Sequence, residues 1–285
     1  QLAVLSIAIG CVIGLLMAFA MLSRHRALRV FASVYVTVVR NTPILVLILL
    51  SFNKSGLPTA WGGVSLKWYV SLAHNSAILS AALNTLIVAL AATFIACVLG
   101  TLLALGIELR RKGSDKGQVV DTLLMAPMII PDIVLAIALL SFFNLLKVGL
   151  GLHSIIISHA VFNIAFVCAV VRTRLKHFDY SILEASIDLG AGWFTTFRRV
   201  LLPAIFPGVL AGGLLAFTLS VDEFIIAFFN SGSGQASTTL PMQIYAMIRF
   251  GVTPEINALA TLVMLVSITA LLASQRLNKA PRTHE

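Results

Sequence analysis

The chain has 285 residues and a net charge of +9; 59% of its residues are hydrophobic, only 11% are charged, and its mean hydropathy is +1.00. This composition lies outside that of soluble domains and within that of integral membrane proteins. We therefore expect an all-α polytopic membrane protein, because a spanning helix satisfies its own backbone hydrogen bonds. Three cysteines at unrelated positions in apolar runs argue against a disulfide framework and a metal site.

Seven apolar stretches are candidate spans, judged against a bilayer core about 30 Å thick that needs about 20 apolar residues per helix. They are 2–22, 41–52 with an amphipathic lead-in from residue 30, 78–107, 119–146, 155–171, 208–229 and 256–274. Glycine pairs at Gly10 and Gly14, and at Gly208 and Gly212, have the spacing that lets membrane helices approach closely.

The first stretch has a second interpretation. It could be a signal peptide, since Ala18-Phe19-Ala20 resembles a cleavage site, but it lacks a basic leader. We expect a retained helix.

The distribution of positive charge predicts the orientation of the spans. Most Lys and Arg residues lie in four segments: 23–40, 108–118, 172–207 and the residues after 274. The other segments hold only Lys54, Lys67, Lys147 and Arg249. Because basic flanks are retained in the cytoplasm, the four basic segments are predicted to be cytoplasmic and the amino terminus to lie outside. Topology accounts for the positive net charge, so we expect no nucleic-acid partner.

A polar stretch over residues 181–203 has the features of a short cytoplasmic helix. Ser181 and Glu184 have the spacing of a capping box, which predicts a helix start, and Gly190 supplies a left-handed stop. One narrow face of this helix carries Ile182, Ala185, Ser186 and Leu189.

A two-turn helix is marginal alone in water, so its apolar face needs a surface to pack on. That surface is either the membrane and the helices of the same chain, with Glu184 serving only as a cap, or a groove on a soluble partner. A second short helix is expected from Trp193, ending at Pro203.

The same stretch carries a family resemblance. The residues E-A-S-I-D-L-G, then nine residues, then V-L-L-P, strongly resemble the cytoplasmic EAA loop of permease subunits of binding-protein-dependent ABC importers. The positions that match are Glu184, Ala185, Gly190, Leu202 and Pro203; the conservative departures are Ser186 and Val200. In that family the EAA helix couples to a cytoplasmic ATPase, which implies a coupling role for Glu184, Ala185, Ser186 and Gly190.

Further stretches look like the spermidine/putrescine branch of that family over about residues 50–277. They include A-P-M-I-I-P-D (126–132), F-T-L-S-V-D-E-F (217–224) and T-T-L-P-M-Q-I-Y-A-M-I-R-F-G-V-T-P-E-I-N-A-L-A-T-L (238–262). Residues 33–50 look more like the polar amino-acid branch, so residues 1–50 are expected to be an N-terminal helix and amphipathic lead-in, with a fused segment as one interpretation. The resemblance implies a domain over 51–277 of six core helices, with an extra N-terminal helix possible, a coupling loop over 172–207, and a cytoplasmic tail over 278–285.

The resemblance also implies partners. The expected complex contains a cytoplasmic ATPase dimer, a second permease subunit and an external solute-binding protein, in a bacterial inner membrane. The sequence has no G-x-x-x-x-G-K-[ST] loop, so ATP and magnesium are expected on the partner ATPase, with no cofactor on this chain.

Three acids fall inside predicted spans, where ionisable side chains are costly and normally face a partner or a water-filled path: Asp132, Asp222 and Glu223. At about 1.5 Å per residue, Asp132 and Asp222 both lie about 20 Å from the cytoplasmic ends of their spans. Pro127 and Pro131 predict a broken helix before Asp132.

We interpret these acids as a pathway for a linear cationic amine. Three aromatic side chains are available for cation–π contacts with it: Phe217, Phe224 and Tyr245. Alternatively, the acids pair with hydroxyls such as Thr218 and Ser220 or with a partner subunit, or Glu223 points to the outer interface.

The most consistent function is therefore that of a permease subunit importing polyamines by alternating access, powered by a separate ATPase. A permease for polar amino acids and an ion-coupled secondary transporter are the alternatives, since intramembrane carboxylates serve the latter too. A membrane enzyme is disfavoured, because Ser, His and Asp residues show no catalytic spacing.

Overall fold

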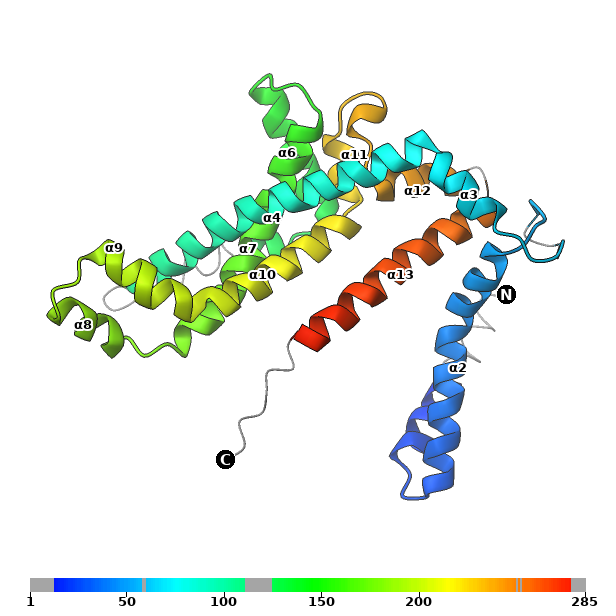
Figure 1. The fold of residues 1–285 in the computed structure, drawn as a ribbon, viewed down its shortest axis with the longest axis horizontal. Helices are drawn as coiled ribbons and strands as arrows, with labels where there is room; N and C mark the ends of the chain where they lie inside the picture. Colours follow the sequence, from blue (N-terminus) through cyan, green and yellow to red (C-terminus); the bar gives the residue numbers. More distant parts are fainter. Residues whose placement is uncertain (1–12, 58–59, 111–124, 250, 252, 278–285) are drawn as a thin grey trace. The chain divides into compact units, whose positions relative to one another are not determined.

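The structure is a computed structural model that describes residues 13–57, 60–110, 125–249, 251 and 253–277 (Figure 1). Within these residues the elements are helices, with one isolated antiparallel bridge between Asn53 and Val64. The chain divides into two compact units, residues 1–73 with 250–285 and residues 74–249. The predicted all-α architecture is confirmed.

The unit of residues 74–249 contains three long helices, α4 (Ser76–Arg110), α7 (Leu152–Lys176) and α10 (Leu202–Asp222), and each packs on the other two (Figure 1). Its shorter elements are α6 (Asp132–Leu145), α8 (Ser181–Asp188), α9 (Trp193–Thr196), the π-helical turn η2 (Phe197–Leu201), α11 (Ile225–Asn230), the 3₁₀ turn η3 (Gln235–Ser237) and α12 (Leu240–Arg249).

The other unit pairs α2 (Arg26–Ser51) with α13 (Pro254–Leu277), and α3 (Lys67–His74) runs up to its boundary. Asn53 organises the turn after α2, since its Oδ1 accepts the N–H groups of Ser55 and Gly62 at 3.1 and 2.9 Å. The predicted span 41–52 and its lead-in form one continuous helix in α2.

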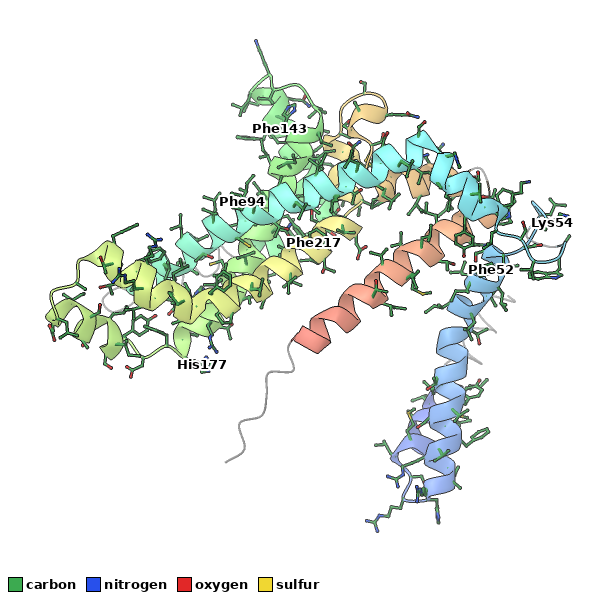
Figure 2. All side chains as sticks on the ribbon, viewed as in Figure 1. Phe52, Lys54, Phe94, Phe143, His177 and Phe217 are labelled. Atoms are coloured by element: carbon green, nitrogen blue, oxygen red, sulfur yellow. The ribbon has the colours of Figure 1, made fainter. Side chains whose placement is uncertain are left out.

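Among the described residues, three helices are long and apolar enough to cross a membrane: Ser76–Leu109, Leu152–Lys176 and Trp193–Asp222. Shorter apolar helices cover Ile13–Leu22, Asp132–Leu145 and Pro254–Val266. The long helices also expose large apolar side chains, such as Phe94 on α4 at 70% (Figure 2). Such a surface suits lipid, where exposed apolar groups carry no hydration cost.

Helices α7 and α10 approach closely at two glycines of α10. A Cβ on Gly208 would lie 3.0 Å from the Cβ of Arg174, and a Cβ on Gly212 would lie 3.3 Å from the Cα of Val167. The predicted close contact is therefore confirmed for this pair. Gly10 lies outside the described residues, and a Cβ on Gly14 would meet no atom within 4 Å.

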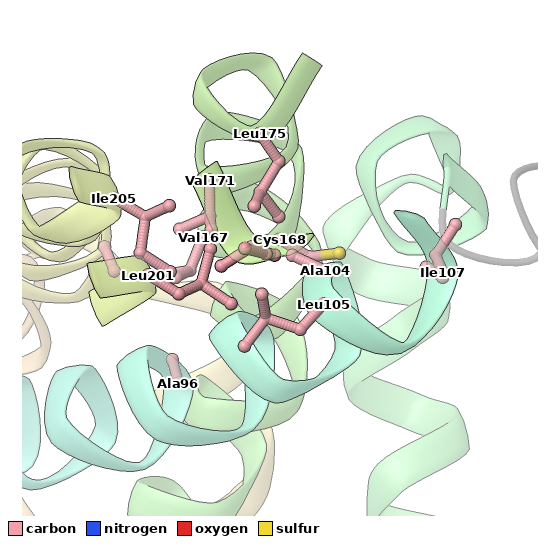
Figure 3. Close-up of a cluster of buried hydrophobic side chains, with 12 residues drawn as sticks. Ala96, Ala104, Leu105, Ile107, Val167, Cys168, Val171, Leu175, Leu201 and Ile205 are labelled. Atoms are coloured by element: carbon pink, nitrogen blue, oxygen red, sulfur yellow. The ribbon is translucent and has the colours of Figure 1, made fainter. Parts of the chain in front are cut away.

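The core between the long helices is a cluster of buried apolar side chains (Figure 3). It joins Leu105 of α4, Leu175 of α7 and Leu201 and Ile205 around the start of α10. Van der Waals contact between these close-packed side chains stabilises the cluster, since lipid leaves no hydrophobic driving force between spanning helices. Helices α4, α7 and α10 thus pack together at the end where Leu183 of α8 joins the cluster.

Two predicted spans are interrupted: the break predicted before Asp132 is confirmed, and a second break, which was not predicted, lies at Glu223. In the span 119–146, residues 119–124 lie outside the described part, residues 125–129 are helical, and α6 begins anew at Asp132. Pro131, at φ −55° and ψ 136°, produces this break because it has no N–H to donate. The span 208–229 is broken at Glu223, which has extended backbone angles of φ −70° and ψ 116° between α10 and α11.

The predicted helix end at Pro203 is wrong. The helix that begins at Trp193 continues to Asp222 as one apolar element of 30 residues. The π-helical turn η2 ends at Leu201, two residues before Pro203, and its wider hydrogen-bonding pattern relieves the clash of the proline ring with the preceding turn. Of the predicted loop 172–207, only residues 177–192 lie between α7 and α9.

Candidate functional site

Helix α8 starts differently from the predicted capping box. Its first residue is Ser181, whose N–H donates to the Asp179 carboxylate over 3.0 Å. The residue at the N-cap position is Tyr180, and its side chain makes no capping hydrogen bond. Hydrogen bonds from the side chain and the backbone of Ser181 lower the pKa of Asp179. The capping box of Ser181 and Glu184 is therefore wrong, because Asp179, two residues before Ser181, supplies the acceptor.

The end of α8 is as predicted. Gly190 has φ +83°, its N–H donates to the Ile187 carbonyl at 2.8 Å, and the Ala191 N–H donates to the Ser186 carbonyl at 3.1 Å. These two bonds form a Schellman motif, in which the left-handed residue is usually glycine. The sequence spacing therefore located the helix stop correctly.

One side of α8 is anchored to its own chain. Leu183 is buried in the core cluster of α4, α7 and α10, and the Ser186 hydroxyl lies 3.0 Å from the hydroxyl of Thr196. Leu183 was not among the residues singled out from the sequence. Its signal was present, since it is an apolar residue on the face opposite Ala185 in a helix with two sides to cover.

The remaining sides of α8 are exposed. Glu184, Ala185 and Ile182 are open to solvent, and Leu189 is 89% exposed. Of the predicted apolar face, Ser186 is thus half-buried against Thr196 while the other members point away from the chain's own core. Leu183 and Ser186 therefore pack on helices of the same chain, as one of the two interpretations predicts. Ile182, Ala185 and Leu189 form an exposed surface of small and apolar side chains.

The predicted pathway acids lie at the two helix breaks. Asp132 is the first residue of α6, and Glu223 follows the last residue of α10. The Glu223 carboxylate accepts the N–H of Ile226 over 2.8 Å, so it caps the start of α11, and the residue is half-buried. Asp222 is exposed.

Packing between α6 and α11 brings the two breaks together. Ala136 and Ile226 are buried in one apolar cluster, and the Asn230 amide donates to the Ala136 carbonyl over 3.3 Å. Asp132 lies one turn before Ala136 and Glu223 lies three residues before Ile226, so both acids lie near this contact between α6 and α11. The structure brings these two predicted acids into one place.

Aromatic rings gather beside Glu223. The ring centroids of Phe224 and Tyr245 are 4.8 Å apart, and Phe228 lies 5.4 Å from Phe224 and 6.4 Å from Tyr245. The structure thus places Phe224 and Tyr245 together, as the cation–π hypothesis requires, and adds Phe228, one helical turn after Phe224. Among the described residues, Phe217 makes no ring contact.

The two hydroxyls considered as partners for the acids have hydrogen-bond partners of their own. Thr218 donates to the Leu214 carbonyl over 2.9 Å, and the Ser220 hydroxyl lies 2.7 Å from Nδ1 of buried His159. Sequence reasoning missed His159; its signal was an ionisable side chain inside the predicted span 155–171, next to Ser158.

The fold and these two sites are those of a helical membrane permease with a short exposed helix after α7. Residues 96–280 match the family described as "Binding-protein-dependent transport system inner membrane component", and the chain belongs to this family. It is therefore a transport component of an importer in the inner membrane, and the family implies an ATPase and a substrate-binding protein as partners. The predicted family is confirmed.

Two curated relatives narrow the likeness. The spermidine/putrescine transport system permease protein PotC of Escherichia coli (strain K12) is 41% identical over 234 residues, which cover 82% of this chain and 87% of PotC. The putrescine transport system permease protein PotI of the same strain is 41% identical over 229 residues, which cover 78% of this chain and 80% of PotI.

One solved structure supports the fold. A bacterial ABC transporter involved in the import of the acidic polysaccharide alginate matches with a TM-score of 0.68 at 14% identity, covering 90% of this chain and 99% of that one.

Proposed function

We propose that this chain is the permease subunit through which an ATP-driven importer moves polyamines such as spermidine or putrescine into the cell. The observation that carries the amine is the acid and aromatic site at the two helix breaks. The names of PotC and PotI, to which the chain is 41% identical, support the same substrate class.

The chemistry of this site suits a protonated linear amine. Asp132, Asp222 and Glu223 supply negative charge, while the rings of Phe224 and Tyr245 supply electron-rich faces next to it. A carboxylate in a low-dielectric span is costly without a counter-charge, and a passing ammonium group supplies one. The acids therefore stabilise a polycation in transit better than they would a zwitterion.

In the unit of residues 74–249, the contact with the ATPase lies at α8, away from the acid site. We assign the ATPase-coupling role to Glu184, Ala185, Ser186 and Gly190, because α8 exposes a short rigid surface next to a glycine stop. ATP and Mg²⁺ act on a dimer of partner ATPases, because this sequence has no phosphate-binding loop.

A second permease subunit, a distinct chain, completes the pathway, and an external solute-binding protein delivers the amine. Closure of the ATPases moves α8 and shifts the permease between outward-open and inward-open states.

The test is uptake of radiolabelled spermidine and putrescine by cells that express the whole transporter with Asp222→Asn in this chain. We expect uptake to fall about tenfold, which corresponds to about 1.4 kcal/mol of lost cation stabilisation. The permease should still copurify with its ATPase, because Asp222 is exposed and its replacement is close in size.

Glu255→Gln is the matched control. It removes one carboxylate outside the acid site while leaving an acceptor for the Ser71 hydroxyl, which lies 3.2 Å away. Uptake by this variant should stay at the wild-type level. Unchanged uptake in Asp222→Asn contradicts the amine pathway. The substrate class is contradicted if an excess of polar amino acid blocks uptake and an excess of spermidine leaves it unchanged.

A further inference from the structure

A buried ion pair joins α4 to α7 at the end that carries α8. The Nε of Arg172 donates to Oε1 of Glu108 over 2.9 Å, and the two side chains are only 9% and 8% exposed. Glu108 lies in the last turn of α4, and Arg172 lies one turn before the end of α7. The pair therefore bridges two long helices close to the start of the α8 segment.

Stability alone does not account for a pair of this kind. Removing two charges from water is costly, and apolar side chains of similar volume often stabilise a buried site equally well. What a guanidinium–carboxylate pair adds is direction, because its charged hydrogen bond holds only in a narrow range of geometries. The apolar core around it has no such preference, since apolar contact is non-directional.

The residues that lead into α8 pack at the same end of α4 and α7. Tyr180, which directly precedes α8, packs against the buried cluster that contains Leu105 and Ile107, the residue before Glu108. The Tyr180 ring meets Phe178 edge to face at 5.5 Å. One turn later, Leu183 enters the core cluster that holds Leu105 and Leu175 (Figure 3).

We propose that Glu108 and Arg172 are a positioning pair that makes α4 and α7 move together with α8, so that displacement of α8 is transmitted to the transmembrane helices instead of being lost by sliding. This inference rests on the proposed function, in which a partner ATPase moves α8. The apolar anchor at Leu183 attaches α8, and the ion pair fixes the relative rotation of the two helices to which it is attached.

The test is the ratio of spermidine transported to ATP hydrolysed by the whole transporter in proteoliposomes. Glu108→Gln keeps the shape of the side chain and removes its charge, and we expect the ratio to fall about fivefold while ATP hydrolysis and ATPase copurification persist. Arg174→Gln is the matched control, since Arg174 is an exposed arginine two residues along the same helix. Its ratio should match the wild type.

Exchange of the two partners separates positioning from mere stability. The double variant Glu108→Arg with Arg172→Glu restores a pair of opposite charges in the same place and should regain most of the ratio. Where neutral variants do not accumulate in the membrane, Arg172→Lys retains the charge without the planar fork, and we expect the ratio to fall about twofold.

A wild-type ratio in Glu108→Gln or Arg172→Lys overturns the inference, as does an exchanged pair that behaves no better than the single variants. Failure of the proposed function is a different result. In that case the wild-type chain would not copurify with an ATPase, or the wild-type complex would not take up spermidine.

Discussion

Around α8, the helices α4, α7 and α10 are continuous and meet in an apolar core, whereas around the acid site the chain is built from the short helices α6 and α11. At the first region a buried leucine and an ion pair hold one geometry. At the second, Glu223 serves as a cap while also belonging to the acid site. Force transmission requires a stiff region, and substrate passage requires side chains that can exchange partners.

The comparison is tested most strongly at Gly190. Gly190→Arg places a side chain at φ +83°, where L-residues are strained by about 1–2 kcal/mol, and disrupts the stop of α8. We expect the permease to lose copurification with its ATPase and to lose uptake with it. Affinity purification followed by uptake assays in the same cells measures both.

Gly192→Arg is the control for Gly190. It adds the same side chain two residues later, where φ is −67° and a Cβ would meet no atom within 4 Å. It should retain most of the association. Equal losses in both variants would show that added bulk, and not the left-handed stop, decides the contact.

At the acid site, Glu223→Gln separates charge from capping. Glutamine still offers an acceptor to the Ile226 N–H, so α11 should keep its hydrogen-exchange protection. Spermidine uptake should fall about tenfold, because the negative charge is gone. Glu223→Ala removes both and should also expose the α11 amides to exchange; wild-type uptake in Glu223→Gln would reduce Glu223 to a cap.

A smaller effect is expected at the anchor of α8. Leu183→Ala removes a buried side chain and should destabilise the docking of α8 by about 2–3 kcal/mol, measured as faster amide exchange confined to α8. Ile187→Ala, at a side chain that is 50% exposed, should change this stability by less than about 0.5 kcal/mol. Equal exchange in the two variants would mean that the core does not hold α8.

Local pattern predicted several elements well and others poorly. The stop at Gly190 was correct because a Schellman motif involves only the last turn of a helix and the residues next to it. The capping box failed because Asp179, two residues away, competes for the same backbone donor. The helix end at Pro203 failed because a proline can be accommodated after a π-turn within a packed helix.

Membrane character, the short helix that begins at Ser181 and its stop at Gly190, the helix break before Asp132 and the permease family were determined by the sequence alone, because hydropathy, helix-stop signals and motif spacing act within a few neighbouring residues. The break at Glu223 was not predicted. Tertiary structure alone decided that Tyr245 meets Phe224 and Phe228, that His159 meets Ser220, and that Glu108 pairs with Arg172. These partners lie on different helices or face one another only after packing. A desolvated polar or aromatic group takes whichever partner packing brings to it, and no local pattern encodes that choice.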